Sequence, residues 1–165
     1  RLSSLVSTIE KIGETYPVIF PTHPRTRENL QRFYPDALRA DSRIITIPPV
    51  GYLEMLGLLK DAKMVLTDSG GIQEETTVLD IPCITLRENT ERPVTVELGT
   101  NELAGHDMGL LLSYARKAIE GNWKKGSVPP LWDGKTSERA VRAICDMLSK
   151  GKIWYGRELN PFLFF

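Results

Sequence analysis

Residues 64–86 read MVLTDSGGIQEETTVLDIPCITL, and this segment indicates the architecture of the whole chain. A short apolar run, residues 64–67, leads through Asp-Ser-Gly-Gly into a helix-compatible segment. A second apolar run, residues 82–86, follows that segment closely. Short buried strands separated by a helix are typical of a βαβ unit, in which the two strands are parallel. The segment therefore predicts a parallel sheet whose strands are joined by helices.

The same alternation continues on both sides of this segment. Helices are expected at residues 2–12, 25–33, 51–60 and 111–119, and a further helix is expected to be capped by Ser137. Strands are expected at residues 17–20 and 43–47, with residues 94–96 as a short fifth strand. We therefore expect an α/β fold, a Rossmann-like parallel sheet with helices on both faces. Ligands of such sheets bind at the carboxyl ends of the strands.

Length, charge and cysteine content exclude several classes of protein. The chain has 165 residues, enough for one ordinary domain, and 21 basic residues balance 21 acidic ones. A zero net charge argues against a general nucleic-acid binder, and no apolar run is long enough to span a membrane. Cys83 and Cys145 fit neither a metal-binding nor a disulfide spacing, so we expect both to be buried free thiols in a reducing, cytoplasmic compartment.

The start of the sequence indicates that it was cut from a longer protein. An amphipathic helix begins at once, without an initiator methionine or a preceding cap residue, so we expect further sequence upstream. We expect residues 1–150 to form one domain. Residues 151–165 form a tail rich in aromatic residues, which packs either on its own domain or on a missing N-terminal domain.

The turn Ser69-Gly70-Gly71 is the strongest local signal for chemistry. A strand that runs into glycines at a helix start presents free N–H groups and the positive end of the helix dipole, which together bind anions. The ligand implied is a phosphate or a diphosphate. The patterns GxxxxGK[ST], GxGxxG and GxSxG are absent, which disfavours a P-loop ATPase, a dinucleotide enzyme and a serine hydrolase. The alternative is a plain strand-to-helix turn capped by Ser69.

Charged residues near this turn extend the hypothesis. Glu75 follows Gly71 by four residues and shares its helix face, where a carboxylate could accept hydrogen bonds from a ribose diol. Arg87 and Arg92 follow the next strand and could balance a diphosphate, or else form minor surface ion pairs. The two histidines, His23 and His106, are isolated and do not make a metal site.

These motifs resemble the non-hydrolysing UDP-N-acetylglucosamine 2-epimerases. The resemblance rests on TDSGGIQEE at residues 67–75, LRENTERP at residues 86–93 and ELGTN at residues 97–101, in that order. It extends over most of residues 17–145. It implies a glycosyltransferase-B-type enzyme of two Rossmann-like domains, of which this chain would be the C-terminal, nucleotide-binding half.

The resemblance also implies an activity. The family interconverts UDP-N-acetylglucosamine and UDP-N-acetylmannosamine, by elimination of UDP to a glycal and its re-addition, without a cofactor. The enzyme would be a cytoplasmic homodimer that serves polysaccharide biosynthesis. Its acid and base residues would come from the N-terminal domain, so we expect this fragment alone to be inactive.

Residue roles follow from the same resemblance. It implies that Ser69, Gly70 and Gly71 hold the diphosphate of UDP, that Glu75 holds the ribose hydroxyls, and that Arg92 stabilises UDP as the leaving group.

Three further positions are implied by it. Val50 would lie beside the uracil, and Met55 stands where the family usually has an aromatic residue near that base, so ring stacking would be replaced by a polarisable apolar contact. His23 resembles a histidine near the cleft and is the single candidate for a catalytic role within these residues.

Other functions are also compatible with these motifs. A UDP-sugar glycosyltransferase half-domain, a hydrolysing epimerase and a non-catalytic UDP-sugar-binding module would each use a similar nucleotide site. An interaction fragment that uses its aromatic tail is a further alternative.

Overall fold

The computed structural model describes residues 2–35 and 42–150. The chain divides into two compact units, Arg1–Val128 and Pro129–Phe165, and each is described by itself. The boundary predicted at residue 150 stays a prediction, because the aromatic tail at residues 151–165 lies outside the described residues.

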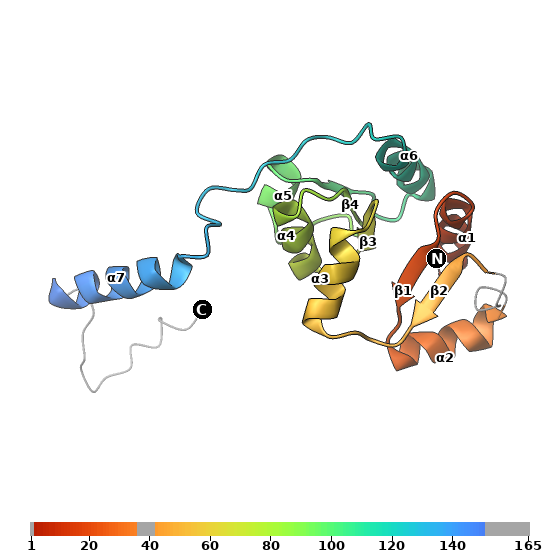
Figure 1. Cartoon of the computed structure of the whole chain (residues 1–165), viewed down its shortest axis with the longest axis horizontal. Coiled ribbons are helices and arrows are strands. Elements are labelled where there is room, and N and C mark those ends of the chain that lie inside the picture. Colours follow the sequence, from red (N-terminus) through yellow and green to blue (C-terminus); the bar gives the residue numbers. More distant parts are fainter. Residues whose placement is uncertain (1, 36–41, 151–165) are drawn as a thin grey trace. The chain divides into compact units, whose positions relative to one another are not determined.

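The helices and strands alternate along the chain, as Figure 1 shows. In order, they are α1 (Leu2–Gly13), β1 (Val18–Pro21), α2 (Pro24–Phe33), β2 (Ile44–Ile47), α3 (Tyr52–Lys60), β3 (Val65–Thr67), α4 (Gly70–Val78), β4 (Cys83–Thr85), α5 (Pro93–Glu97), β5 (Asn101–Leu103), α6 (Met108–Ile119) and α7 (Thr136–Ser149). The α/β class predicted from the sequence is confirmed.

Every strand pairing among the described residues is parallel. β1 pairs with β2, and β4 lies between β3 and β5. The hydrogen-bonded ladder is thus divided into a two-stranded and a three-stranded sheet. Apolar packing connects them, because Val18 of β1 lies against the same core cluster as Ile84 of β4. Strands of three or four residues offer few ladder bonds, so packing contributes much of their cohesion.

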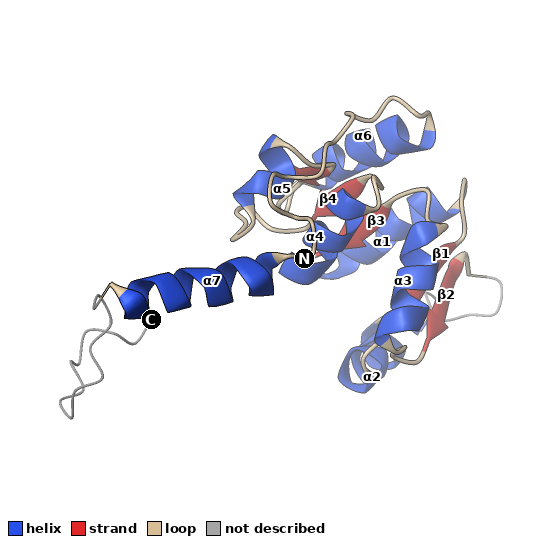
Figure 2. Cartoon of the chain, turned by 60° about the vertical axis from the view of Figure 1, so that its left-hand side comes forward, coloured by secondary structure: helices blue, strands red, loops and turns tan. Residues whose placement is uncertain are grey.

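Alternation along β4 gives its two faces different chemistry. Ile84 points into an apolar cluster with Ile12 of α1 and with Leu111 and Ala115 of α6. Its neighbour Thr85 points to the opposite face, because side chains alternate along a strand, and it donates to Asn101 Oδ1 there. Helix α4 covers that face of the sheet (Figure 2). Strand β4 therefore has the apolar core on one side and polar side chains on the other. A second cluster, Val6, Leu30 and Ile44, joins α1, α2 and β2.

Two sequence predictions about local structure are wrong. Residues 94–96 belong to helix α5, and the fifth strand is Asn101–Leu103. Pro93 at the first helical position presets the backbone, and the Thr95 N–H and hydroxyl both donate to the Arg92 carbonyl, which closes the first turn. The cap of α7 is Lys135 rather than Ser137.

The cysteine prediction is correct for one residue. Cys83 is fully buried in β4, and burial raises the pKa of its thiol. Cys145 is exposed on α7, contrary to the prediction. The apolar spacing of α7 indicates an amphipathic helix, but none of its side chains is buried among the described residues. None of the described helices combines the length and the apolar character required to cross a lipid bilayer.

Candidate functional site

No side chain among the described residues caps the backbone N–H groups at the amino end of α4. Ser69 is the N-cap residue in extended conformation, but its hydroxyl makes no capping bond. The first backbone bond of the helix runs from the Gln73 N–H to the Ser69 carbonyl, over 3.3 Å. Within the described part of the chain, the N–H groups of Gly70, Gly71 and Ile72 donate to no partner. In α6, by contrast, the Asp107 carboxylate accepts from the Gly109 and Leu110 N–H groups, at 2.8 and 2.9 Å.

The two glycines of this turn are not required by the protein itself. Neither has a positive φ. A Cβ atom on Gly70 would lie 3.8 Å from Arg92 Cγ, and one on Gly71 would lie 3.9 Å from Ser69 Oγ, both ordinary contact distances. Alanine would therefore fit both positions in this structure. What glycine provides is open access to the three free N–H groups, because a Cβ atom tilts toward the amino end of its helix.

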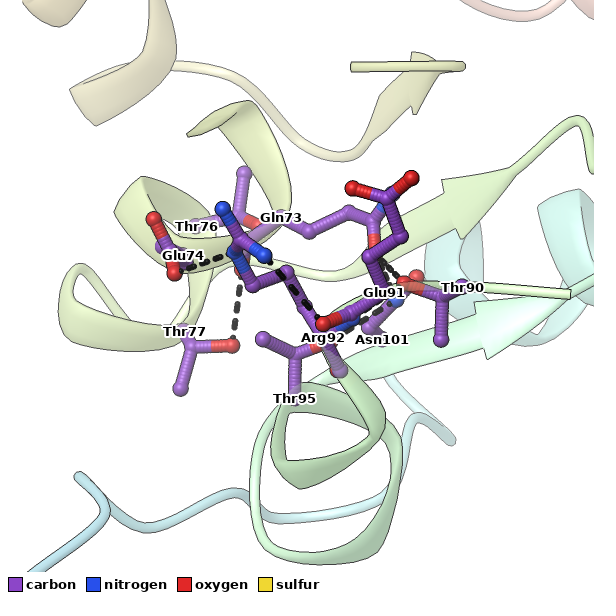
Figure 3. Close-up of polar contacts among 9 residues, drawn as sticks. All are labelled: Gln73, Glu74, Thr76, Thr77, Thr90, Glu91, Arg92, Thr95 and Asn101. Atoms are coloured by element: carbon purple, nitrogen blue, oxygen red, sulfur yellow. Dashed lines mark hydrogen bonds and ion pairs between the residues drawn. The ribbon is translucent and has the colours of Figure 1, made fainter. Parts of the chain in front are cut away.

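Arg92 lies beside the glycine turn. The loop after β4 brings it there, and its Nε is 2.6 Å from Glu74 Oε1 on α4 (Figure 3). The Nε atom is enclosed, and its geometry toward Glu74 is that of an ion pair without an aligned hydrogen bond. Nη1 donates to the Glu91 carbonyl over 3.2 Å. Both side chains of the pair are about 40% exposed (42% and 39%), so solvent screens their attraction and the pair contributes little stability.

A buried polar network holds the loop that carries Arg92. Gln73 Oε1 accepts from Thr90 Oγ1 at 2.6 Å and from Asn101 Nδ2 at 3.1 Å. Asn101 also donates to Thr95 Oγ1 at 3.0 Å and accepts from Thr85 Oγ1 at 2.7 Å. We call these five residues the Gln73–Asn101 network. It ties α4, β4, β5, α5 and the Arg92 loop together.

The sequence does not predict this network, although Gln73 and Asn101 both lie within the motifs at residues 67–75 and 97–101. The available signal was polarity where burial is expected, such as a threonine inside the apolar run of β4. Buried polar groups require partners, so such residues indicate a network, although the sequence does not show which residues pair.

The remaining predicted residues lie on other parts of the same unit. Glu75 is half-buried on α4, one turn beyond Gly71. Val50 precedes α3 and Met55 lies within it, both half-buried. His23 is the exposed N-cap of α2, and its Nδ1 accepts from the Arg25 N–H at 3.4 Å. No hydrogen bond of the described residues joins these side chains to the glycine turn. Their roles stay predictions.

Histidine and acidic residues do not gather into a metal centre in residues 2–35 and 42–150. No group of three or more His, Cys, Asp or Glu side chains there could hold an ion. The functional groups that do gather at the glycine turn are backbone N–H donors and Arg92, which is paired with Glu74 of α4. Such N–H donors and a guanidinium suit an anionic ligand.

Comparison with solved structures places the chain in a class. The Methanocaldococcus jannaschii UDP-GlcNAc 2-epimerase, solved in complex with UDP-GlcNAc and UDP, matches with a TM-score of 0.73 and 45% identity over 88% of this chain. S. aureus MnaA, solved with UDP, matches with a TM-score of 0.74 and 30% identity over 88% of this chain. The fold is thus that of the Rossmann-like half of a glycosyltransferase-B-type protein.

The sequence comparison identifies the family. The family model described as UDP-N-acetylglucosamine 2-epimerase matches residues 1–145. The Methanocaldococcus jannaschii UDP-N-acetylglucosamine 2-epimerase is 46% identical over an alignment of 153 residues that covers 87% of this chain. The chain belongs to the UDP-N-acetylglucosamine 2-epimerase family. It spans about 40% of the length of the curated relatives and solved structures that it matches.

Proposed function

We propose that the amino end of α4 binds the diphosphate of a uridine nucleotide. The observation that carries this proposal is the open turn, where three N–H groups lack partners and two glycines serve neither packing nor backbone geometry. Such donors, with the helix dipole behind them, favour an anion at this position. The similar solved structures were determined with UDP, or with UDP-GlcNAc and UDP, and this supports uridine diphosphate as that anion.

The charged side chains complete this proposed site. Arg92 lies against Gly70 and is exposed enough to exchange Glu74 for a phosphate oxygen. Ser69, whose hydroxyl is unused as a cap, adds a further donor. Glu75 would accept hydrogen bonds from the ribose, with Val50 and Met55 beside the uracil, and His23 is retained as the one candidate for a role in the cleft. In this proposal Arg92 both binds the diphosphate and stabilises the UDP that leaves.

For the whole protein we propose a non-hydrolysing 2-epimerase. It would interconvert UDP-N-acetylglucosamine and UDP-N-acetylmannosamine by UDP elimination and re-addition, with acid and base residues from an N-terminal domain. The share of the relatives that this chain covers, about 40%, supports a second domain. The enzyme would act in the cytoplasm as a homodimer that supplies polysaccharide synthesis. The chain by itself would bind UDP without turnover.

A product assay on the whole protein distinguishes this proposal from its alternatives. Incubation with UDP-N-acetylglucosamine is expected to give UDP-N-acetylmannosamine. Accumulation of free N-acetylmannosamine and UDP would indicate a hydrolysing epimerase, and sugar transfer to an acceptor would indicate a glycosyltransferase. Tight nucleotide binding with no product would indicate a sensor module.

The proposed role of Glu75 predicts a change in ribose recognition. Glu75→Ala is expected to weaken UDP binding by about tenfold or more, because a charge-assisted hydrogen bond contributes about 1.5–3 kcal/mol. It should also remove the preference for UDP over 2′-deoxy-UDP, measured by calorimetric titration. Glu28→Ala, which removes an exposed carboxylate of α2, serves as the matched control. A Glu75→Ala protein that still discriminates the two ligands would refute the assignment.

The ion pair between Glu74 and Arg92 predicts that a change at Glu74 strengthens UDP binding, whereas the change at Glu75 weakens it. Glu74→Gln removes the carboxylate that competes with the diphosphate for Arg92, so UDP affinity is expected to rise by about two- to fivefold at low salt, as befits an exposed pair. The gain should shrink as salt is added, because screening weakens both attractions. Unchanged or weaker binding at low salt would mean that Arg92 does not meet the phosphates.

A further inference from the structure

The peptide groups of Arg92 are held by side chains on both sides. Its N–H donates to Thr90 Oγ1 over 2.9 Å. Its carbonyl accepts from Thr95 Oγ1 at 2.7 Å and from the Thr95 N–H at 3.0 Å. A loop residue whose N–H and C=O are both bound has little freedom to rotate. The side chain of Arg92 therefore leaves the loop from a fixed point.

The direction of each hydrogen bond that links the Arg92 peptide groups to the Gln73–Asn101 network is determined. Gln73 Oε1 is an amide oxygen and can only accept, so Thr90 Oγ1 donates its single proton to that atom and accepts from the Arg92 N–H. Thr95 Oγ1 gives its proton to the Arg92 carbonyl and accepts from Asn101 Nδ2. The second proton of that amide goes to Gln73 Oε1. The chain of bonds through Thr90 and the chain through Thr95 and Asn101 therefore both end at this oxygen atom.

Burial makes the geometry of the Gln73–Asn101 network rigid. Gln73 is 1% exposed, and Thr95 and Asn101 are 0% exposed. Removing a partner from a polar group in such surroundings costs stability, so the buried hydrogen bonds of the network favour a single geometry. Gln73 lies on α4, in the first turn after the glycines, so the network links the two candidate phosphate contacts directly (Figure 3).

We propose that the Gln73–Asn101 network positions Arg92 over the amino end of α4, so that the guanidinium and the helix N–H groups meet one diphosphate together. The inference rests on the proposed function, and it adds residues that touch no ligand. Thr90, Gln73 and Asn101 act through Arg92 as positioning residues. Their contribution is therefore expected to vanish when Arg92 is absent.

A double-mutant cycle on UDP binding by the full 165-residue chain tests the inference. Arg92→Ala alone is expected to weaken UDP binding by about tenfold or more. Thr90→Val removes a hydroxyl of a half-buried residue and should weaken binding by about three- to tenfold when Arg92 is present. In the Arg92→Ala background, Thr90→Val should have no further effect. Thr90→Ser, which keeps the hydroxyl, should bind as the parent protein does.

The outcomes separate the inference from the proposed function. If Thr90→Val has no effect, or the same effect in both backgrounds, the positioning role is overturned while the site stands. If Arg92→Ala leaves UDP binding unchanged, the proposed site itself is wrong, and the inference falls with it. Thr8→Val is the matched control, because it removes a buried hydroxyl that donates to the Ser4 carbonyl within α1 at 2.7 Å, and it should leave UDP binding unchanged.

Discussion

Replacing both Gly70 and Gly71 with alanine is expected to abolish measurable UDP binding while leaving the chain as stable as before or slightly more so. The two added methyl groups meet nothing closer than 3.8 Å within the protein. Glycine to alanine at positions of negative φ stabilises by about 0.4–1 kcal/mol, chiefly by restricting the unfolded chain. The methyl groups instead project toward the amino end of α4, into the space that a phosphate must enter.

The magnitude follows from the contacts that would be lost. Each charge-assisted bond from an N–H group to a phosphate oxygen contributes about 1.5–3 kcal/mol, so losing two of them weakens binding by about a hundredfold or more. Calorimetric titration with UDP and urea unfolding measure the two effects on the same samples. Gly57→Ala is the control, since Gly57 lies inside α3 with nothing near its Cβ position. A double-alanine variant that binds UDP normally would contradict the proposed site.

Replacing Gly99 with alanine is expected to cause the largest loss of stability among single glycine changes. Its Cβ atom would lie 2.6 Å from the Thr95 carbonyl oxygen and in closer contact still with Thr77 Oγ1. The carbonyl belongs to the backbone of α5, so it cannot rotate away as a long side chain could. Overpacking of this kind costs about 1–3 kcal/mol. Gly57→Ala should instead stabilise the chain by about 0.5–1 kcal/mol, because glycine is unfavourable inside a helix.

Gly99→Ala also bears on the site. Gly99 is buried between α5 and β5, and the clash would displace α5, whose Thr95 is part of the Gln73–Asn101 network. UDP binding should therefore weaken under conditions where the variant is still folded. Thermal unfolding followed by circular dichroism measures the stability. A Gly99→Ala protein as stable as the parent would show that α5 and β5 do not pack as described.

The sequence was informative wherever structure depends on local pattern. Apolar runs and helical spacing located β1 to β4 and most helices, because the period of apolar residues depends only on near neighbours. The glycine turn was placed at the end of a strand for the same reason. Residues 94–96 were misassigned because Val-Thr-Val favours a strand, whereas Pro93 and the bonds to the Arg92 carbonyl close a helical turn there.

The network could not have been predicted in this way. Gln73 pairs with Thr90 and Asn101, which lie 17 and 28 residues farther along the chain. Such pairs exist only after the strands have been ordered and the loop after β4 has folded back onto α4. The division of the ladder into two sheets is likewise a property of tertiary packing, and nothing in the individual strands indicates it.

Amide chemical shifts test the central claim most directly. In a ¹⁵N-labelled sample of the 165-residue chain titrated with UDP, the N–H signals of Gly70, Gly71 and Ile72 should show the largest downfield proton shifts, because these three groups gain phosphate acceptors. Uridine, which lacks the diphosphate, should leave them nearly unchanged. If UDP binds while these signals stay in place and others move, the diphosphate lies elsewhere and the account of the α4 amino end is wrong.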